Sequence, residues 1–513
     1  MTSLSHLPTE LIALILTHLP VIDLIRCQQV SLLLRALVKT NANLQYKISL
    51  ALACMEDAQT STRPSREKLK ELCSFQRLWT RNSKFEAQVV NSVVPYNDHM
   101  NLAQDTMVQG LGMRTLKFTR LSCELTKEPE KAWEVNLDFD IIEFAFDPDE
   151  GLLIAIEAKD NKCYVRFLDM NTGKGHKDAS KDSVYMGEFG FEQENQMPLD
   201  ADILVLEMWS CRNTVLILAN WMSAEREVFR LVTWDWHTGA KLLELQPGLP
   251  GMGEHFICSV SCLTPELVLL GLIEGSPGSQ KAFIKAVDLT LGAEAYSQAF
   301  TFEFPPLNSN MADLGIWRNV PTTPSRRSVH HNYLPFQCTQ EDAAISFGLF
   351  LDRAEFENQG EFHFVIPTSK FLQCIEKAKL SDSRTIKWRG WIPHNCRLFE
   401  VNGAWDVAGC RSLCQNDRHL QVMNFSQSAV RFYQSFPDGS LTLVDDESEV
   451  AGPYWKHPIR TTLPYLAHEI PLPDETEYDM MYCGSDTIFL CNEQTTMCLR
   501  PQYQQNSLSA RVV

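Results

Sequence analysis

The segment from residue 11 to residue 19 constrains the fold more than any other part of the chain. It predicts a helix with almost no polar side, because its apolar residues are Leu11, Ile12, Leu14, Ile15, Leu16 and Leu19. A helix that is apolar all round must be covered all round. A bundle of about 45 residues buries too little surface to do this alone. Either the rest of the chain or a separate protein therefore has to cover this helix.

Two prolines and a serine divide the first fifty residues into short helices. Pro8 suits the first turn of a helix, where its missing N–H costs nothing, and Pro20 ends the first helix and opens a second. Ser31 is the expected N-cap of a third helix, which runs through Val38 and gains a further apolar contact at Ile48. The sequence thus predicts a compact three-helix module.

This module resembles an F-box. The matching pattern is Leu-Pro-x-Glu-Leu-Ile from Leu7, Ile-Leu-x-x-Leu-Pro from Ile15, Asp-Leu at 23–24, Val-Ser at 30–31 and Arg-x-Leu from Arg35. The resemblance covers residues 4–50. The chain departs from the family pattern at Leu34, where a Trp is usual, and matches it loosely near Tyr46.

The resemblance implies a partner. Members of the F-box family bind the Skp adaptor subunit of an SCF ubiquitin ligase (Skp–cullin–F-box) and reach a cullin through it. By this resemblance, the module core and the adaptor-facing surface would be formed by Leu7, Pro8, Leu11, Ile12, Ile15, Leu16, Leu19, Pro20, Leu24 and Val30. The alternative is a helical cap that packs on the main domain of the same chain.

The charge distribution limits the partners of the remaining chain. Residues 1–85 carry a net charge of +5 and residues 86–513 a net charge of −23. An acidic main domain argues against nucleic acid, which is bound through cationic contacts with phosphate, and against an anionic membrane surface. The basic N-terminal part would suit an acidic partner, although a solvated basic surface explains it equally well.

The cysteines indicate a reducing compartment. The chain has 16 cysteines and no recognisable secretory signal, which predicts reduced thiols and an intracellular protein, cytoplasmic, nuclear or both. No apolar run approaches the length of about 20 residues that a membrane span requires.

A linker and a docking helix are expected after the module. Residues 56–66 are polar and contain Pro64, and Ser65 begins a helix that runs to Trp79 with Leu69 and Leu72 on the same face. We therefore divide the chain into an F-box domain (1–55), a linker with a docking helix (56–85) and a mainly-β domain (86–513) that recognises a substrate.

The sequence of the main domain predicts short strands joined by tight turns. Asp147-Pro-Asp-Glu-Gly151 between two apolar runs predicts a hairpin. A degenerate repeat of a strand, an aspartate and a turn occurs at Asp169, Asp235 and Asp288. It resembles the last strand of a WD-repeat blade, which predicts a propeller-like fold. The alternative is a β-sandwich or stacked sheets with similar turns. The predicted fold class is α+β and multidomain.

The sequence shows no recognisable catalytic, cofactor or metal site. It has no phosphate-binding glycine loop and no Gly-x-Ser-x-Gly elbow. Cys258 and Cys262 are four apart, as are Cys410 and Cys414, but neither pair is accompanied by the second pair at a set distance that metal sites usually have. We therefore expect a protein that is not an enzyme.

These observations favour a substrate-recognition subunit of an SCF-type ligase, which binds the Skp adaptor through the F-box and an unknown target protein through the β domain. The chain also resembles long fungal F-box proteins with divergent propeller regions. Two alternatives remain open: an interaction scaffold that recruits no cullin, and a propeller-based hydrolase. Carboxylates or histidines that converge in a deep polar pocket would favour the hydrolase.

Overall fold

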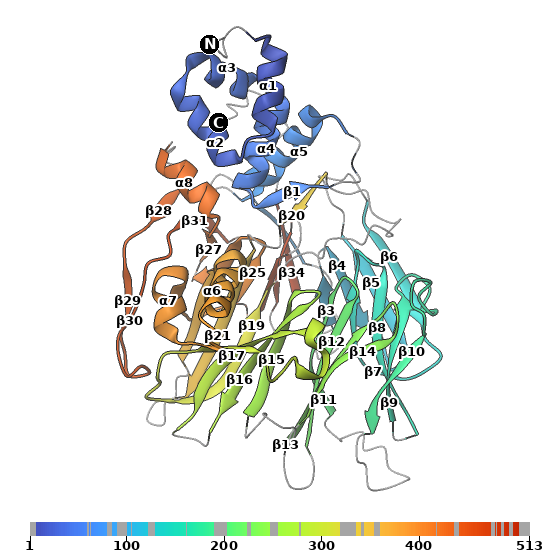
Figure 1. Ribbon diagram of the computed structural model, residues 1–513. Coiled ribbons are helices and arrows are strands. Elements are labelled where there is room, and N and C mark those ends of the chain that lie inside the picture. Colours follow the sequence, from blue (N-terminus) through green and yellow to red (C-terminus); the bar gives the residue numbers. More distant parts are fainter. Residues whose placement is uncertain are drawn as a thin grey trace.

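The computed structural model (Figure 1) places a small helical module on top of a ring of β-sheets. It describes residues 7–58, 61, 63–79, 85–89, 100–103, 105–121, 129–160, 162–188, 203–222, 227–246, 255–275, 279–318, 335–339, 343–352, 360–416, 418–435, 441–472, 478, 480–483, 487–491 and 496–501.

The module contains four helices: α1 (Thr9–Thr17), α2 (Val21–Val30), α3 (Leu32–Thr40) and α4 (Ala42–Leu52). The segment expected to form one third helix is divided into α3 and α4 at Asn41. The backbone of Asn41 leaves the helical region (φ −89°, ψ 112°), and its side chain accepts hydrogen bonds from the N–H groups of Asn43 and Leu44. An asparagine with this geometry is an N-cap, which explains why a new helix begins here.

The helices of the module enclose a small apolar core of their own. It is formed by Ile12, Leu16, Leu24, Val38, Leu44 and Ile48. Gln45 is buried as well, and its side-chain amide donates a hydrogen bond of 2.8 Å to the carbonyl of Val38. This bond satisfies a polar group that would otherwise be costly to bury.

Seven sheets of four or five strands follow, arranged as the blades of a propeller. We number them along the chain. Blade 1 contains β3 (Met100–Ala103), β4 (Thr106–Gly110), β5 (Thr115–Arg120) and β6 (Lys131–Asn136); blade 2 contains β7 (Ile141–Asp147), β8 (Leu152–Lys159), β9 (Lys162–Asp169) and β10 (Ser183–Glu188). Blade 3 contains β11 (Ile203–Cys211), β12 (Thr214–Met222), β13 (Glu227–Asp235) and β14 (Ala240–Leu245). The predicted short strands and the hairpin at Asp147–Gly151 are thus confirmed.

Blades 4 to 6 carry additional elements. Blade 4 contains β15 (His255–Thr264), β16 (Leu267–Glu274), β17 (Lys281–Asp288), β18 (Phe300–Glu303) and β23 (Thr385–Ile386), with a 3₁₀ helix at Leu289–Glu294. Blade 5 contains β19 (Asn310–Trp317), β21 (Ala344–Asp352), β22 (Gly360–Pro367) and β24 (Arg397–Val401), with α6 (Thr368–Leu380) and α7 (Trp388–Asn395) inserted. Blade 6 contains β25 (Trp405–Ala408), β26 (Arg411–Asn416), β27 (His419–Asn424), β31 (Tyr465–Pro471) and β28 (Thr442–Val444), with α8 (Gln427–Ser435).

Blade 7 closes the ring with strands from both ends of the domain. It contains β2 (Phe85–Val89), β34 (Thr496–Pro501), β33 (Ile488–Cys491) and β32 (Met480–Cys483) in this order. β2 pairs with β34 in an antiparallel register from Phe85 with Pro501 to Val89 with Met497. This pairing ties the start of the domain to its end, and a closed propeller leaves only the short outer edges of its blades unpaired.

The innermost strand of each blade is the first to follow the preceding blade: β3, β7, β11, β15, β19, β25 and β32. Neighbouring innermost strands contact one another, as β11 does with β15 and β15 with β19. The module lies at the side where these strands end. The turn after β25 brings Cys410 Sγ to 3.7 Å from the carbonyl oxygen of Ala53. We call this side the module face and the opposite side the far face.

The aspartate repeat forms the expected turns, but not at the expected place in the blade. Asp169, Asp235 and Asp288 end β9, β13 and β17, which are third strands, so the prediction that they end the last strand was wrong. Each carboxylate accepts a hydrogen bond from a backbone N–H two or three residues later. Such Asx turns reverse the chain toward the fourth strand.

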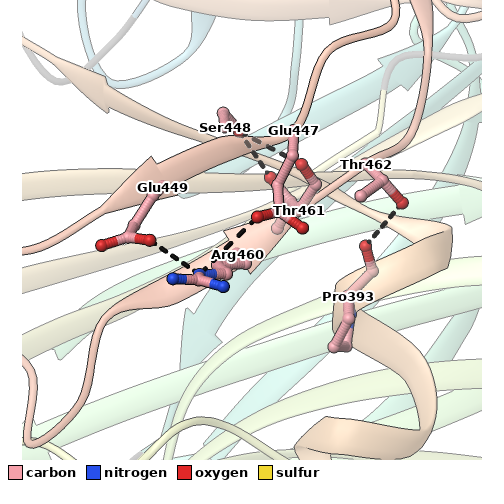
Figure 2. Close-up of polar contacts among 7 residues, drawn as sticks. All are labelled: Pro393, Glu447, Ser448, Glu449, Arg460, Thr461 and Thr462. Atoms are coloured by element: carbon pink, nitrogen blue, oxygen red, sulfur yellow. Dashed lines mark hydrogen bonds and ion pairs between the residues drawn. The ribbon is translucent and has the colours of Figure 1, made fainter.

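An insertion in blade 6 runs along the outside of blade 5. Its hairpin pairs β29 (Ser448–Val450) with β30 (Ile459–Thr461). Figure 2 shows Arg460 of this hairpin beside Glu449 and Glu447, and Thr462 bonded to the carbonyl oxygen of Pro393 in α7. In the loop that connects β29 to β30, Trp455 is 3% exposed and packs in the core of blade 5. The insertion is therefore part of the fold of blade 5.

Candidate functional site

Exposed apolar side chains are concentrated on the module. Among the described residues, 14 large hydrophobic side chains are exposed, and eight of these belong to residues 7–33. They are Leu7, Leu11, Leu14 and Ile15 at α1, Ile22 and Val30 on α2, and Leu32 and Leu33 on α3. We call these eight residues the apolar surface of the module. Because single exposed apolar residues are common but such a concentration is not, this surface is the candidate interaction site of the module.

The ten residues predicted for the module divide between its core and its surface. Ile12, Leu16 and Leu24 are buried, and Leu19 packs partly buried against them. The six that remain exposed are Leu7, Pro8, Leu11, Ile15, Pro20 and Val30. The structure adds Leu14, Ile22, Leu32 and Leu33, which the family pattern did not single out. In the sequence only their apolar character pointed to them. Their helical spacing did not separate them from the core residues, because some of them lie next to the core-facing positions of their helix.

Polar contacts hold the helices beneath this surface in place. Lys47 Nζ in α4 donates hydrogen bonds of 2.7 Å to the carbonyl of Thr17 and 2.8 Å to that of Leu19. These carbonyls lie at the C-terminal end of α1, where a positive charge also interacts favourably with the helix dipole. Arg35 Nε donates to the carbonyl of Gln28 at 2.9 Å and joins α3 to α2. These hydrogen bonds therefore fix α1, α2 and α3, which carry the exposed apolar residues, relative to one another and to α4.

A different side of the module docks on the propeller. α5 (Ser65–Leu78) lies against α4, and Leu69, Leu72 and Phe75 share an apolar cluster with residues of blades 6 and 7. β1 (Met55–Asp57) pairs with β20 (Phe336–Cys338), which lies between β19 and β21 in the sequence. In Figure 1, α4 and α5 lie between the propeller and the other helices. The docking contacts thus leave the apolar surface uncovered.

A small polar network fixes this docking. Asp57 accepts hydrogen bonds from Lys68 Nζ at 2.9 and 3.0 Å and from the Tyr46 hydroxyl at 2.9 Å. The same hydroxyl lies 3.0 Å from the carbonyl of Pro335 in the propeller domain. Burial raises the pKa of Tyr46, and the nearby carboxylate of Asp57 raises it further, so the phenol stays protonated. It therefore remains a hydrogen-bond donor between module and propeller.

The comparison with protein families decides the nature of the module. The family model described as F-box domain matches residues 4–46. The N-terminal module is an F-box domain. No curated protein matches the chain.

Solved structures show only distant likenesses. One is Drosophila Semaphorin 1b, extracellular domains 1-2, with 8% identity, coverage of 83% of this chain and 88% of that chain, and a TM-score of 0.39. Another is the Nup133 β-propeller domain of Vanderwaltozyma polyspora, with 8% identity, coverage of 82% and 98%, and a TM-score of 0.36. No functional argument follows from likenesses this low. The seven-bladed propeller behind the F-box rests on the strand pairing described above.

The central cavity of the propeller tests the hydrolase alternative. Its volume is about 680 Å³, and four carboxylates line it: Asp147, Glu207, Asp313 and Asp406. Each already accepts a hydrogen bond, from Ser210 Oγ, Ser259 Oγ, the N–H of Leu314 and the N–H of Cys483 respectively. Three of these bonds cross from one blade to the next. Asp147, Glu207 and Asp406 therefore join blades, and no histidine is among the described residues that line the cavity.

The described residues contain neither a candidate metal site nor a helix that could span a membrane. Within the described ranges, no group of three or more His, Cys, Asp or Glu side chains is arranged to hold a metal ion. Cys258 and Cys262 both lie on β15, beside β-bulges of that strand. In the part of the chain that the structure covers, no helix has the length and apolar character needed to cross a bilayer.

Proposed function

We propose that this chain is the substrate-recognition subunit of an SCF-type ubiquitin ligase. F-box domains typically bind the Skp adaptor within SCF complexes, and an F-box followed by a propeller fits a substrate receptor of this kind. The observation that carries the proposal is the apolar surface of the module, which remains exposed although α4 and α5 are docked on the propeller. In this proposal the Skp adaptor covers that surface and brings a cullin with it.

The adaptor contact would use Leu7, Pro8, Leu11, Ile15, Pro20 and Val30, while Ile12, Leu16, Leu19 and Leu24 hold the shape of the module. Each large apolar side chain that becomes fully buried contributes about 1.5–3 kcal/mol. Six to eight such side chains are enough for a stable interface.

The target protein would bind on the propeller, at the far face. The module occupies the opposite face, so a target bound at the far face does not compete with the adaptor. The chain itself would perform no bond chemistry. It would raise the effective concentration of the target near a ubiquitin-transferring enzyme. This role belongs in the cytoplasm or nucleus, and we propose the division into residues 1–55, 56–85 and 86–513 on the same grounds.

The test is affinity purification of the tagged full-length chain with quantification of the Skp adaptor and a cullin. The variant is Leu7→Ala/Pro8→Ala/Leu11→Ala, which changes exposed residues and leaves the buried core intact. The matched control is Leu380→Ala, because Leu380 is 89% exposed and lies on α6, in the propeller domain. Circular dichroism establishes that each variant is folded.

We expect wild type and Leu380→Ala to recover adaptor and cullin, and the triple variant to lose both. Recovery of the adaptor without a cullin would support the scaffold alternative in place of the ligase. Absence of the adaptor from all samples would refute the proposal.

A further inference from the structure

The module end of the central cavity contains a buried arginine. Arg318 directly follows the last residue of β19 and lines the cavity. It is only 7% exposed, whereas arginine is rarely buried unless it is paired. Its Nη1 donates a hydrogen bond of 2.7 Å to the carbonyl oxygen of Cys262 in blade 4. This bond crosses the boundary between blades 4 and 5.

The rest of the guanidinium has no partner among the described residues. Nε and Nη2 of Arg318 are buried and form no hydrogen bond within that part of the chain. Burial lowers the pKa of Arg318, because the charged guanidinium is removed from water. Among the described residues, no carboxylate forms a hydrogen bond or ion pair with Arg318, although four of them line the same cavity.

A charge in this position is costly for the protein alone. An ionised group removed from water is normally compensated by an opposite charge or by a full set of hydrogen bonds. A guanidinium offers five N–H donors in a planar fork that matches the geometry of carboxylate and phosphate. An oxyanion is therefore the ligand that best compensates Arg318.

We propose that the central cavity binds a small molecule bearing a phosphate or carboxylate group, with that group bound by Arg318. The volume of about 680 Å³ lies in the range of small-molecule pockets, about 300–1,000 Å³. Trp209, Trp317 and Tyr482 add aromatic surface to the lining, and Ser210 and Ser261 add hydroxyls. Since Nε and Nη2 are covered, the anion reaches them when the Arg318 rotamer changes.

The position of Arg318 favours a free small molecule over a side chain of a bound target. β19 contains eight residues from Asn310 to Trp317 and ends at the module face. At about 3.3 Å per residue, such a strand is roughly 26 Å long. A modified side chain on a target at the far face cannot span this distance. The proposed ligand site lies within the propeller and does not require that the module bind an adaptor.

Glu207, which also lines the cavity, does not oppose an anion with its full charge. Burial raises the pKa of Glu207 to about 7 and also raises the pKa of Asp313. Part of the Glu207 population is therefore neutral near pH 7. The cavity is less negative than its residue types suggest.

The test is thermal unfolding of the full-length chain in potassium phosphate, in potassium citrate and in potassium chloride of equal ionic strength. A bound ligand stabilises the folded state. We expect phosphate or citrate to raise the melting temperature of the wild type by about 2 °C or more. Arg318→Gln should remove this rise. Arg212→Gln is the control, because Arg212 is exposed at the β11–β12 turn on the same face.

An equal rise in wild type and Arg318→Gln would overturn the proposal. Hydrogen exchange of the wild type provides a test that does not depend on the folding of the variant. Phosphate or citrate should slow exchange at residues 314–318 and 258–262, and unchanged exchange there in both anions would also overturn it. A phosphoserine peptide that protects these strands when neither small anion does would assign the site to a target protein, against the proposal.

Discussion

Ser259 Oγ donates a hydrogen bond of 2.6 Å to Glu207 Oε1 across the boundary between blades 3 and 4. The N–H of Val260 donates to the other oxygen of Glu207 at 2.6 Å. The same Ser259 Oγ accepts a bond of 3.1 Å from the N–H of Ile316 in blade 5. One carboxylate and one hydroxyl thus join three consecutive blades around the cavity.

The position of Glu207 predicts an unusual pH dependence of stability. Burial raises its pKa in the folded state to about 7 from an ordinary value of 4.5. Between these values the unfolded chain loses the proton while the folded chain keeps it, so folding is weakened as pH rises. The shift corresponds to a loss of up to about 3 kcal/mol between about pH 4 and pH 8. Urea unfolding of wild type and Glu207→Gln at pH 5 and pH 8 measures this contribution.

We expect the pH slope of the urea midpoint to be less negative in Glu207→Gln than in the wild type. A loss of stability that the glutamine causes equally at every pH does not affect the result, because it leaves the pH slope of the urea midpoint unchanged. Glu266→Gln is the control, since Glu266 is exposed at the turn between β15 and β16. Identical slopes in wild type and Glu207→Gln would show that Glu207 does not titrate in this range.

Every boundary between blades has a polar link of this kind. Further links join Asn101 to the carbonyl of Phe144, Asp147 to Ser210, Arg318 to the carbonyl of Cys262, the N–H of Ala344 to the carbonyl of Gly409, Asp406 to the N–H of Cys483, and Asp105 to Thr487. Apolar packing between sheets tolerates sliding, whereas a hydrogen bond fixes one position. These links therefore fix how neighbouring blades sit.

The closure of blade 7 predicts the effect of truncation. β34 lies between β2 and β33, so removal of residues 496–513 leaves both neighbours with unpaired edges. Exposed strand edges template pairing with other chains. We expect this variant to elute as aggregates in size-exclusion chromatography. Removal of residues 502–513 leaves β34 complete and should give the elution volume of the wild type; aggregation of both variants would argue against the role of β34.

Asp57 predicts a rescue experiment at the docking site. Asp57→Ala leaves the ammonium of Lys68, whose side chain is 8% exposed, without its counter-charge. Because the Asp57 side chain is 49% exposed and partly screened, we expect a loss of about 1–2 kcal/mol in urea unfolding. Asp57→Ala/Lys68→Met removes the unpaired charge as well and should recover most of this loss. A double variant less stable than Asp57→Ala would contradict this explanation.

The F-box could be identified from sequence because its information is local. Short helices punctuated by Pro8, Pro20 and Ser31 are encoded within 50 residues, and the family comparison confirms the assignment. The division at Asn41 was missed because apolar residues continue on both sides of it. Whether the ten predicted residues contact an adaptor stays a prediction.

The propeller was predicted from Asp169, Asp235 and Asp288, but its number of blades was not. These turns occur in blades 2 to 4, where the four strands follow one another with short connections. Blades 5 and 6 contain inserted helices and a hairpin, and blade 7 combines strands more than 390 residues apart in sequence. The cavity was missed for the same reason, since Glu207 and Arg318 are brought together only by the closed ring. The sequence Pro-Asp-Gly at 437–439 also predicts a hairpin turn, and these residues lie outside the described part of the chain.

Two residues of the blade 6 insertion, Trp455 and Arg460, are expected to contribute very differently to the free energy of unfolding. Trp455 packs against Phe362 and Phe364, with ring centroids 5.2 and 5.9 Å apart. Trp455→Ala should cost about 3–5 kcal/mol, the usual loss for a large aromatic side chain in a core, and hydrogen exchange should accelerate across residues 446–462. The control is Arg460→Ala in the same hairpin, because its ion pair with Glu449 (Figure 2) joins two exposed side chains and its loss should leave the urea midpoint nearly unchanged. Equal losses of unfolding free energy in the two variants would contradict this expectation. They would show that Trp455 contributes no more to the stability of blade 5 than the exposed contacts of the hairpin do.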